Sequence, residues 1–317
     1  MKRLEDLGQA ERCCRGGTAL CIGVFDGVHR GHQQLMQHCR KQAKEAGWQS
    51  LVLTFTSHPL AVLAPPYAPK LLTGAQEKAE LIRQQGMDLC LMLDFTESFA
   101  AIEPDRFIRE VLVGTCRARV IACGKDFRFG AKGAGDVHLL REQAGAEGYK
   151  VHILPSLYEE GIPVKSTRIR QCLIDGHIRE AERLMGHPYR LHARVVAGDR
   201  RGRRLGYPTA NLEVPAELLI PCDGVYAVRT TVEGETFGGM MNIGMRPTFA
   251  AEERTLEVHL LDFAGDLYDR DMKVEWVEFV RSERRFASGQ ALAEQIASDE
   301  AATRRILADR GCGAGGS

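Results

Sequence analysis

Two hydrophobic patterns divide the chain, and the first runs from Ala19 to about Met185. Here short apolar runs, which are typical of buried strands, alternate with longer amphipathic stretches. The apolar runs are Leu20–Phe25, Leu51–Phe55, Leu89–Leu93, Val120–Ala122 and Val151–Leu154. Helical periodicity falls between them, at His32–Ala46, Ala75–Gln85 and Asp105–Leu112. The alternation predicts an α/β fold, a doubly wound parallel sheet with helices on both faces, in which ligands bind at the carboxyl ends of the strands.

The second pattern begins after Gly186 and alternates apolar and polar residues with a period of two. Five runs follow it: Tyr189–Val196, Gly224–Val232, Phe237–Ile243, Thr255–Asp262 and Met272–Val280. Short strands bounded by turn residues, followed by a helix near Ser288–Leu307, predict a small closed β-barrel packed by a C-terminal helix. We therefore predict one domain at 1–186, a second at 187–310, and a disordered glycine-rich tail at 311–317.

Composition narrows the class of protein. The 317 residues suffice for two domains, and 42 basic residues balance 42 acidic ones, so no general positive field indicates nucleic acid or an anionic membrane as a partner. No apolar run reaches the roughly 20 residues of a membrane span, and residues 1–12 lack a signal-peptide core. Ten cysteines without a Cys-x-x-Cys pair indicate reduced thiols. We expect a cytoplasmic protein without an obligate protein partner.

The turn Gly23–His32 follows the first predicted strand and holds three glycines and two histidines. Glycines let backbone amides face an anion, and a helix that begins near His29 and His32 favours phosphate at its amino end. The turn therefore predicts nucleotide phosphate transfer. As an alternative, the histidines only cap the helix or pack against it. Metal ligation is disfavoured because no third ligand lies at a recognisable spacing.

A second basic segment, Pro163–Arg170, precedes an apolar-periodic stretch. Ser166 or Thr167 is expected to begin a helix, and their hydroxyls join Lys165, Arg168 and Arg170 in a compact set of anion-binding groups. Taken alone, the segment is equally consistent with a capped helix that carries solvated charges.

The loop Gly202–Asn211 combines glycines with Arg203 and Arg204. Its backbone amides and arginines suit a nucleotide phosphate. Thr209 and Asn211 lie two residues apart, so in an extended segment their side chains point to the same side and offer hard oxygen ligands for magnesium. An ordinary turn is the alternative.

Together these segments resemble the prokaryotic bifunctional riboflavin kinase/FAD synthetase family, over nearly the whole chain. The amino-terminal half is similar to the nucleotidyltransferase superfamily, and the carboxyl-terminal half to riboflavin kinases. Further matching segments are Thr54–Pro59, Leu71–Thr73, Gly124–Gly130, Pro221–Tyr226, Asn242–Phe249 and Leu256–Tyr268. One departure is Lys165, where relatives commonly carry another serine.

The resemblance implies that riboflavin is phosphorylated with ATP to FMN, and that FMN is then adenylylated with a second ATP to FAD and pyrophosphate, with Mg2+ as the cofactor. In the adenylyl step, His29 and His32 would stabilise the transition state. The implied nucleotide contacts are Gly23, Phe25, Asp126, Ser166, Thr167, Arg168 and Arg170. Asp126 is equally well explained as a turn aspartate.

In the kinase step, the resemblance makes Glu257 the base that accepts the proton of the riboflavin 5′-hydroxyl, although a solvent-facing glutamate is the usual fate of this residue type in an alternating strand. Gly202, Arg203 and Arg204 would bind nucleotide, and Thr209 and Asn211 the metal. Arg281 and Phe286 would cover the flavin, unless this segment is an ordinary exposed connection. An enzyme with one active half and a flavin-binding protein without turnover are the rival functions.

Overall fold

The computed structural model describes residues 1–197, 206–247 and 252–311. The chain forms two compact units, Met1–Ser166 and Thr167–Ser317. The domain boundary near residue 186 stays a prediction. No helix among the described residues is long and apolar enough to cross a membrane.

The first unit is built on a six-stranded sheet of order β1-β4-β3-β2-β5-β6, in which every neighbouring pair is parallel. The strands are β1 (Lys2–Leu4), β2 (Thr18–Ile22), β3 (Gln49–Phe55), β4 (Leu89–Leu93), β5 (Ala118–Gly124) and β6 (Lys150–Leu154). Strand order reverses at β2, whose neighbours are β3 and β5, so a crevice is expected at the carboxyl ends of β2 and β5.

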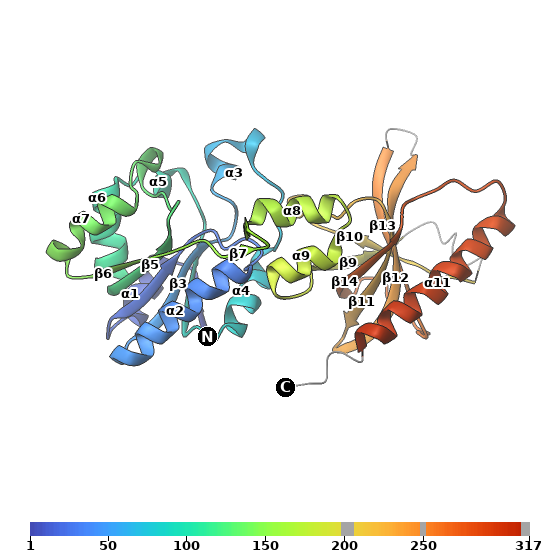
Figure 1. The fold of residues 1–317 in the computed structure, drawn as a ribbon, viewed down its shortest axis with the longest axis horizontal. Helices are drawn as coiled ribbons and strands as arrows, with labels where there is room; N and C mark the ends of the chain where they lie inside the picture. Colours follow the sequence, from blue (N-terminus) through green and yellow to red (C-terminus); the bar gives the residue numbers. More distant parts are fainter. Residues whose placement is uncertain (198–205, 248–251, 312–317) are drawn as a thin grey trace. The chain divides into compact units, whose positions relative to one another are not determined.

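Helices cover both faces of this sheet (Figure 1). The longer ones are α1 (Leu7–Cys13), α2 (Arg30–Ala46), α4 (Ala75–Gln84), the π-helix η2 (Phe107–Thr115) and α7 (Val137–Glu147). The side chains of β2 alternate between two cores: Leu20 and Ile22 pack with α1, η2 and α7, whereas Cys21 packs with α2 and α4. The doubly wound α/β prediction is confirmed.

Short elements connect these helices and strands. They are α3 (Leu60–Leu63), η1 (Pro65–Tyr67), α5 (Glu97–Ala100), α6 (Pro104–Arg106), η3 (Ala131–Gly133) and the hairpin β7 (Tyr158–Glu159) and β8 (Ile162–Pro163). Two helices follow, α8 (Ser166–Ile174) and α9 (Ile178–Met185).

The second unit holds a closed antiparallel barrel of order β10-β13-β12-β11-β14-β9. Its strands are β9 (Arg190–Val196), β10 (Ala210–Glu213), β11 (Gly224–Val232), β12 (Glu235–Pro247), β13 (Glu252–Leu260) and β14 (Asp271–Arg281). Helix α11 (Gly289–Gly311) packs against β11, β12 and β14 (Figure 1). The predicted barrel and C-terminal helix are confirmed.

The structure corrects the predictions from sequence at two places. Ala210–Glu213 is a sixth barrel strand, because pairing with β9 and β13 compensates for its short, polar sequence. Gly311 ends helix α11 and does not belong to a disordered tail, and residues 312–317 lie outside the described ranges. Strand β1 and helix α1 lie within the predicted domain 1–186, before the first of the apolar runs that indicated it.

Candidate active sites

The turn that follows β2 has an unusual backbone. Phe25 and Val28 have φ angles of 50° and 38°, and Gly27 has a φ of 79°. Positive φ is costly for a residue with a side chain, above all for β-branched valine. At Gly27 a Cβ atom would also lie 2.7 Å from Cδ1 of Leu72. The surrounding structure therefore dictates this conformation.

His29 caps helix α2, because its Nδ1 accepts a hydrogen bond of 3.3 Å from the backbone N–H of His32. An accepting Nδ1 in a neutral imidazole leaves the proton on Nε2. Capping and chemistry are compatible, since the cap orients the ring and fixes which nitrogen is the donor.

His32 lies directly beside His29. The two rings stack with centroids 3.5 Å apart, and Phe25 meets His32 edge-on at 5.2 Å. Among the described residues Nδ1 of His32 is buried without a hydrogen-bond partner. Burial, then the neighbouring His29 and the charge of Lys78, hold the pKa of His32 well below its usual value, so the ring is neutral at pH 7.

A cavity of about 240 Å³ opens beside both histidines, at the carboxyl ends of β2, β5 and β6. It is lined by Ile22, Gly23, Phe25, His29, Gly31, His32, Leu35, Gly124, Lys125, Asp126, Phe127, Leu154, Pro155, Ser156, Leu157 and Val164. Asp126, exposed at this cavity, accepts a hydrogen bond of 3.2 Å from Nζ of Lys165. The position at the switch point of the sheet is where this fold class binds nucleotides.

Ser166 begins helix α8, as predicted, and its Oγ donates to the backbone carbonyl of Asp26 at 2.9 Å. This bond joins the second basic segment to the turn. Thr167, Arg168 and Arg170 continue α8 in the second compact unit, where Arg168 donates to Glu180 at 2.8 Å. Their contribution to the first site stays a prediction.

In the barrel, Oγ1 of Thr209 donates a hydrogen bond of 3.2 Å to Oε2 of Glu257. Strand register places Asn211 of β10 and Asn242 of β12 directly opposite Glu257 on its two sides. Directly paired residues of antiparallel strands point to the same face, so a hydroxyl, two amides and one carboxylate gather there. Leu256 and Val258, on either side of Glu257 in the chain, are buried.

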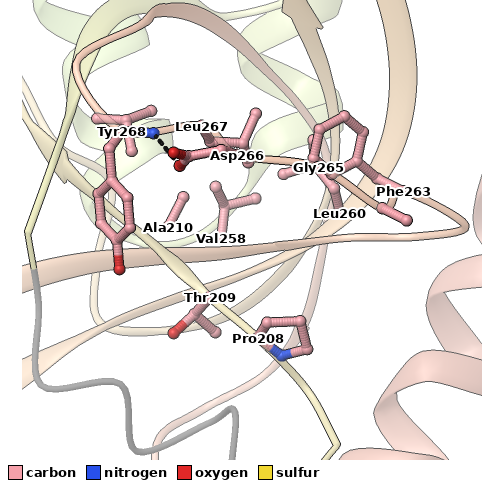
Figure 2. A pocket seen from close by; sticks show the side chains of 12 residues that line it. Pro208, Thr209, Ala210, Val258, Leu260, Phe263, Gly265, Asp266, Leu267 and Tyr268 are labelled. Carbon is pink, nitrogen blue, oxygen red and sulfur yellow. Dashed lines mark hydrogen bonds between the residues drawn. The ribbon is translucent and has the colours of Figure 1, made fainter.

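Two cavities meet at Thr209. The larger, of about 560 Å³, has an apolar floor and aromatic walls: in Figure 2, Ala210 and Val258 lie between Tyr268 and Phe263. The smaller, of about 320 Å³, is lined by Tyr207, Thr209, Val225, Met240, Asn242, Glu257, His259, Arg281, Glu283, Arg284, Phe286, Leu292, Ile296 and Asp299. Of these two cavities, Glu257 lines the smaller and Val258 the larger.

The predicted flavin-covering residues lie together at the smaller cavity. Arg281 makes an ion pair of 2.7 Å with Asp299 of α11, whose side chain is buried, and its guanidinium carbon also lies 5.8 Å from the centre of the Phe286 ring. The guanidinium carbon of Arg284 lies over the same ring at 4.8 Å. Gly202, Arg203 and Arg204 lie outside the described residues.

The donor set near Glu257 suits a hard divalent cation. Thr209 and Asn211 supply a hydroxyl and an amide oxygen on the side of the barrel that carries the Glu257 carboxylate. Among the described residues, no group of three His, Cys, Asp or Glu side chains is placed to hold a metal, and His29 and His32 accordingly have no third such ligand beside them.

Sequence reasoning missed several residues that shape these sites. Phe263, Asp266 and Tyr268 line the larger barrel cavity, and Asn242 faces the smaller one. All four lie within segments that resemble the kinase family, which was the available signal. Asp26, buried within the first turn, and Lys78, buried beneath it, carried no signal, because charged residues at such positions are usually solvated.

Comparison with known proteins follows the same division. A family model described as FAD synthetase matches residues 12–168, and one described as riboflavin kinase matches residues 185–307. The chain thus combines a nucleotidyltransferase of the flavin type with a flavin kinase barrel.

Curated relatives cover nearly the full length. The bifunctional riboflavin kinase/FMN adenylyltransferase of Escherichia coli strain K12 is 39% identical over 308 residues, 97% of this chain and 98% of that one. The enzyme of the same description from Pseudomonas fluorescens is 38% identical, over 92% and 94% of the two chains. A crystal structure of a protein from Streptococcus pneumoniae called a macrolide-efflux protein has a TM-score of 0.84 at 30% identity, over 96% of this chain and 98% of that one.

This chain belongs to the bifunctional riboflavin kinase/FMN adenylyltransferase family. Enzymes of this family use ATP and typically a divalent metal.

Proposed function

We propose that the chain makes FAD from riboflavin in two ATP-dependent steps, at two separate sites. The barrel phosphorylates riboflavin to FMN, and the parallel-sheet unit adenylylates FMN. The single observation that carries the proposal is the presence of two sets of functional side chains in one chain. His29 stacks on His32 beside one cavity, and Thr209 is hydrogen-bonded to Glu257 where the two barrel cavities meet.

In the adenylyl step, a phosphate oxygen of FMN attacks the α-phosphorus of ATP. The bond from that phosphorus to the oxygen bridging to the β-phosphorus breaks, and pyrophosphate leaves. No group of the protein needs to form a covalent bond, so alignment and charge stabilisation account for catalysis. Nε2–H of His29 and a ring N–H of neutral His32 donate to the oxygens that gain charge.

Triphosphate binding in this site is assigned to the turn and to the start of α8. We propose that the region around Gly23 and Phe25 lies against the nucleotide, while Ser166, Thr167, Arg168 and Arg170 hold the β- and γ-phosphates. Lys165 supplies a further cation at the cavity mouth, where Asp126 holds its ammonium. The amino end of α2 favours the same anion.

In the kinase step, the riboflavin 5′-hydroxyl attacks the γ-phosphorus of ATP. Its proton passes to Glu257, a new oxygen–phosphorus bond forms, and ADP leaves. The larger cavity, with its aromatic walls and apolar floor, suits the adenine of ATP, and the smaller one suits the flavin. Thr209 lies on both cavities, which is where a γ-phosphate would meet the hydroxyl.

Thr209 and Asn211 would hold Mg2+ in the barrel, and the ion supplies charge neutralisation for the transferred phosphoryl group. Arg281 and Phe286 would cover the flavin ring, with Arg284 also over the Phe286 ring. The ion pair of Arg281 with Asp299 holds this segment against α11.

We propose the cytoplasm as the site of action, because all nine cysteines in the described part of the chain are free thiols. The expected ligands are riboflavin, FMN, FAD and ATP, with neither nucleic acid nor an obligate protein partner.

A time course from riboflavin and ATP, with FMN, FAD, ADP and pyrophosphate resolved, tests the whole proposal. FMN should rise first and FAD should follow. FMN without FAD would leave a kinase only, and binding of flavin without ADP or pyrophosphate would reduce the chain to a flavin-binding protein.

A further inference from the structure

Lys78, a residue of α4, lies fully buried beneath the turn that follows β2. Its Nζ donates hydrogen bonds to two backbone carbonyls, that of Phe55 at 2.8 Å and that of Val24 at 3.1 Å. Phe55 is the last residue of β3, and Val24 belongs to the turn. Burying an ammonium is costly unless it is hydrogen-bonded, so this lysine is held for a structural or chemical purpose.

A negative charge, opposite to that of the Lys78 ammonium, lies on the turn that follows β2. The Asp26 carboxylate, also buried, accepts from the backbone N–H groups of Leu72 at 2.9 Å and of Thr73 at 3.2 Å. Oγ1 of Thr73 in turn accepts from the N–H of Gly27 at 3.1 Å. The turn is therefore tied on one side to residues 72–73 and on the other, through Lys78, to the end of β3.

These ties act where the backbone is strained. Val24 comes directly before Phe25, and its carbonyl accepts a second hydrogen bond, from Oγ1 of Thr54 at 2.9 Å. Phe25 and Val28, with positive φ, lie between this carbonyl and His29. A strained conformation persists only when its surroundings over-determine it, and Lys78 supplies one of the determining contacts.

The charge of Lys78 also reaches the histidines. Burial lowers the pKa of the lysine to about 8, although the Asp26 carboxylate and the Cys90 thiol raise it. At pH 7 the ammonium is mostly charged. After burial and the neighbouring His29, this charge contributes to the lowered pKa of His32.

We propose that Lys78 is a positioning residue for adenylyl transfer: its buried ammonium fixes the turn at residues 23–29 in the conformation that presents His29 and His32 to the nucleotide phosphates. This inference rests on the proposed adenylyl transfer at that turn. Lys78 has no proposed contact with substrate. Its hydrogen bonds join the end of β3 to the turn, and it acts on the histidines through the backbone of that turn.

Lys78→Met tests the role, because methionine fills similar volume without the ammonium. We expect kcat for FAD formation from FMN to fall about 10²-fold, the order of loss for a slightly misplaced catalytic group, with a smaller change in the KM for ATP. Phosphorylation of riboflavin by the same protein should stay within twofold, because the barrel is in the other unit. Lys41→Met, on an exposed lysine of α2, is the matched control and should change neither activity.

Circular dichroism and a retained thermal unfolding transition of the parallel-sheet unit establish that Lys78→Met is folded, because kinase activity reports only on the barrel. A folded variant with FAD formation within twofold of the unsubstituted protein would overturn the proposal. If the unsubstituted protein itself forms no FAD from FMN, the proposed function fails instead, and the role of Lys78 with it.

The unsubstituted protein gives an independent test should Lys78→Met fail to fold. Besides the Asp26 carboxylate, the ammonium faces the Cys90 thiol, which has a pKa raised to about 12, and His32, which has a pKa well below its usual value, so neither of these last two groups changes charge near pH 8. The substrate phosphates are already ionised there. The rate of FAD formation should fall between pH 8 and 9.5, because the neutral amine donates a weaker hydrogen bond to the Val24 carbonyl than the ammonium does. The rate of the kinase step should not show this fall.

Stability should change in the opposite direction over the same range. The unfolded chain keeps the lysine proton up to a pKa of 10.5, whereas the folded chain loses it near 8, so the unfolded state binds more protons between these values. The free energy of unfolding of this unit therefore gains a contribution that rises with pH.

FAD formation that stays level from pH 8 to 9.5 would contradict the proposal.

Discussion

Thr209, which directly precedes β10, and Glu257 of β13 are joined by a hydrogen bond of 3.2 Å, at the point where the larger and the smaller cavity of the barrel meet. The bond places the proposed metal ligand and the proposed base against one another. A phosphoryl group delivered from the larger cavity would therefore reach a hydroxyl held in the smaller one. This relationship makes the kinase half of the chain open to direct tests.

Glu257→Gln should remove the base and keep the shape of the side chain. We expect riboflavin phosphorylation to fall by roughly 10²–10⁴-fold, the usual contribution of a general base, while adenylylation of supplied FMN continues. Glu213→Gln, at an exposed glutamate of β10, is the control. Near-normal FMN formation by Glu257→Gln, measured by separating riboflavin from FMN, would refute the assignment.

Thr209→Val should remove the hydroxyl at nearly constant volume. The kinase step should then need a higher Mg2+ concentration for half-maximal rate, whereas Thr209→Ser, which keeps the hydroxyl, should stay close to the unsubstituted protein. Titrating Mg2+ at fixed ATP measures the difference. Equal Mg2+ dependence in the two variants would exclude Thr209 as a ligand.

His29 can be separated into its capping and chemical roles. Asparagine is a strong helix N-cap, so His29→Asn should retain the cap, whereas His29→Ala should lose about 1 kcal/mol of unfolding free energy. Both lack the Nε2–H donor, and both should lose roughly 10²–10³-fold in FAD formation. A His29→Asn variant with full FAD synthesis would mean that capping is the only role of this residue.

Lys165→Ser should weaken ATP binding in the adenylyl step. Its ammonium and the Asp126 carboxylate form an exposed pair, so stability should hardly change. We expect the KM for ATP to rise about three- to tenfold, and less so at high salt, because one cation is lost beside the triphosphate. Lys150→Ser, at the amino end of β6, should leave this KM unchanged. If the two variants behave alike, Lys165 does not bind nucleotide.

The sequence was informative wherever local pattern and structure agree. Buried strands such as β3 and β4 read as apolar runs, and the glycine and histidine turn after β2 could be found by residue type and spacing. Strand β10 could not be found this way, because its four residues are held by pairing with β9 and β13 and have little propensity of their own. The burial of Lys78 could not be predicted from the sequence either, since its ammonium is hydrogen-bonded to carbonyls that come from two other segments.

The sequence by itself determined the two fold classes, because hydrophobic periodicity is a local property, and it identified the family through motifs that are contiguous in the chain. Only the tertiary structure decided which groups meet. His29 accepts from His32 within one turn, but Glu257 meets Thr209 across 48 positions, and Ser166 reaches Asp26 across 140. Such contacts depend on strand register and on the packing of segments far apart in the chain, which no local pattern encodes.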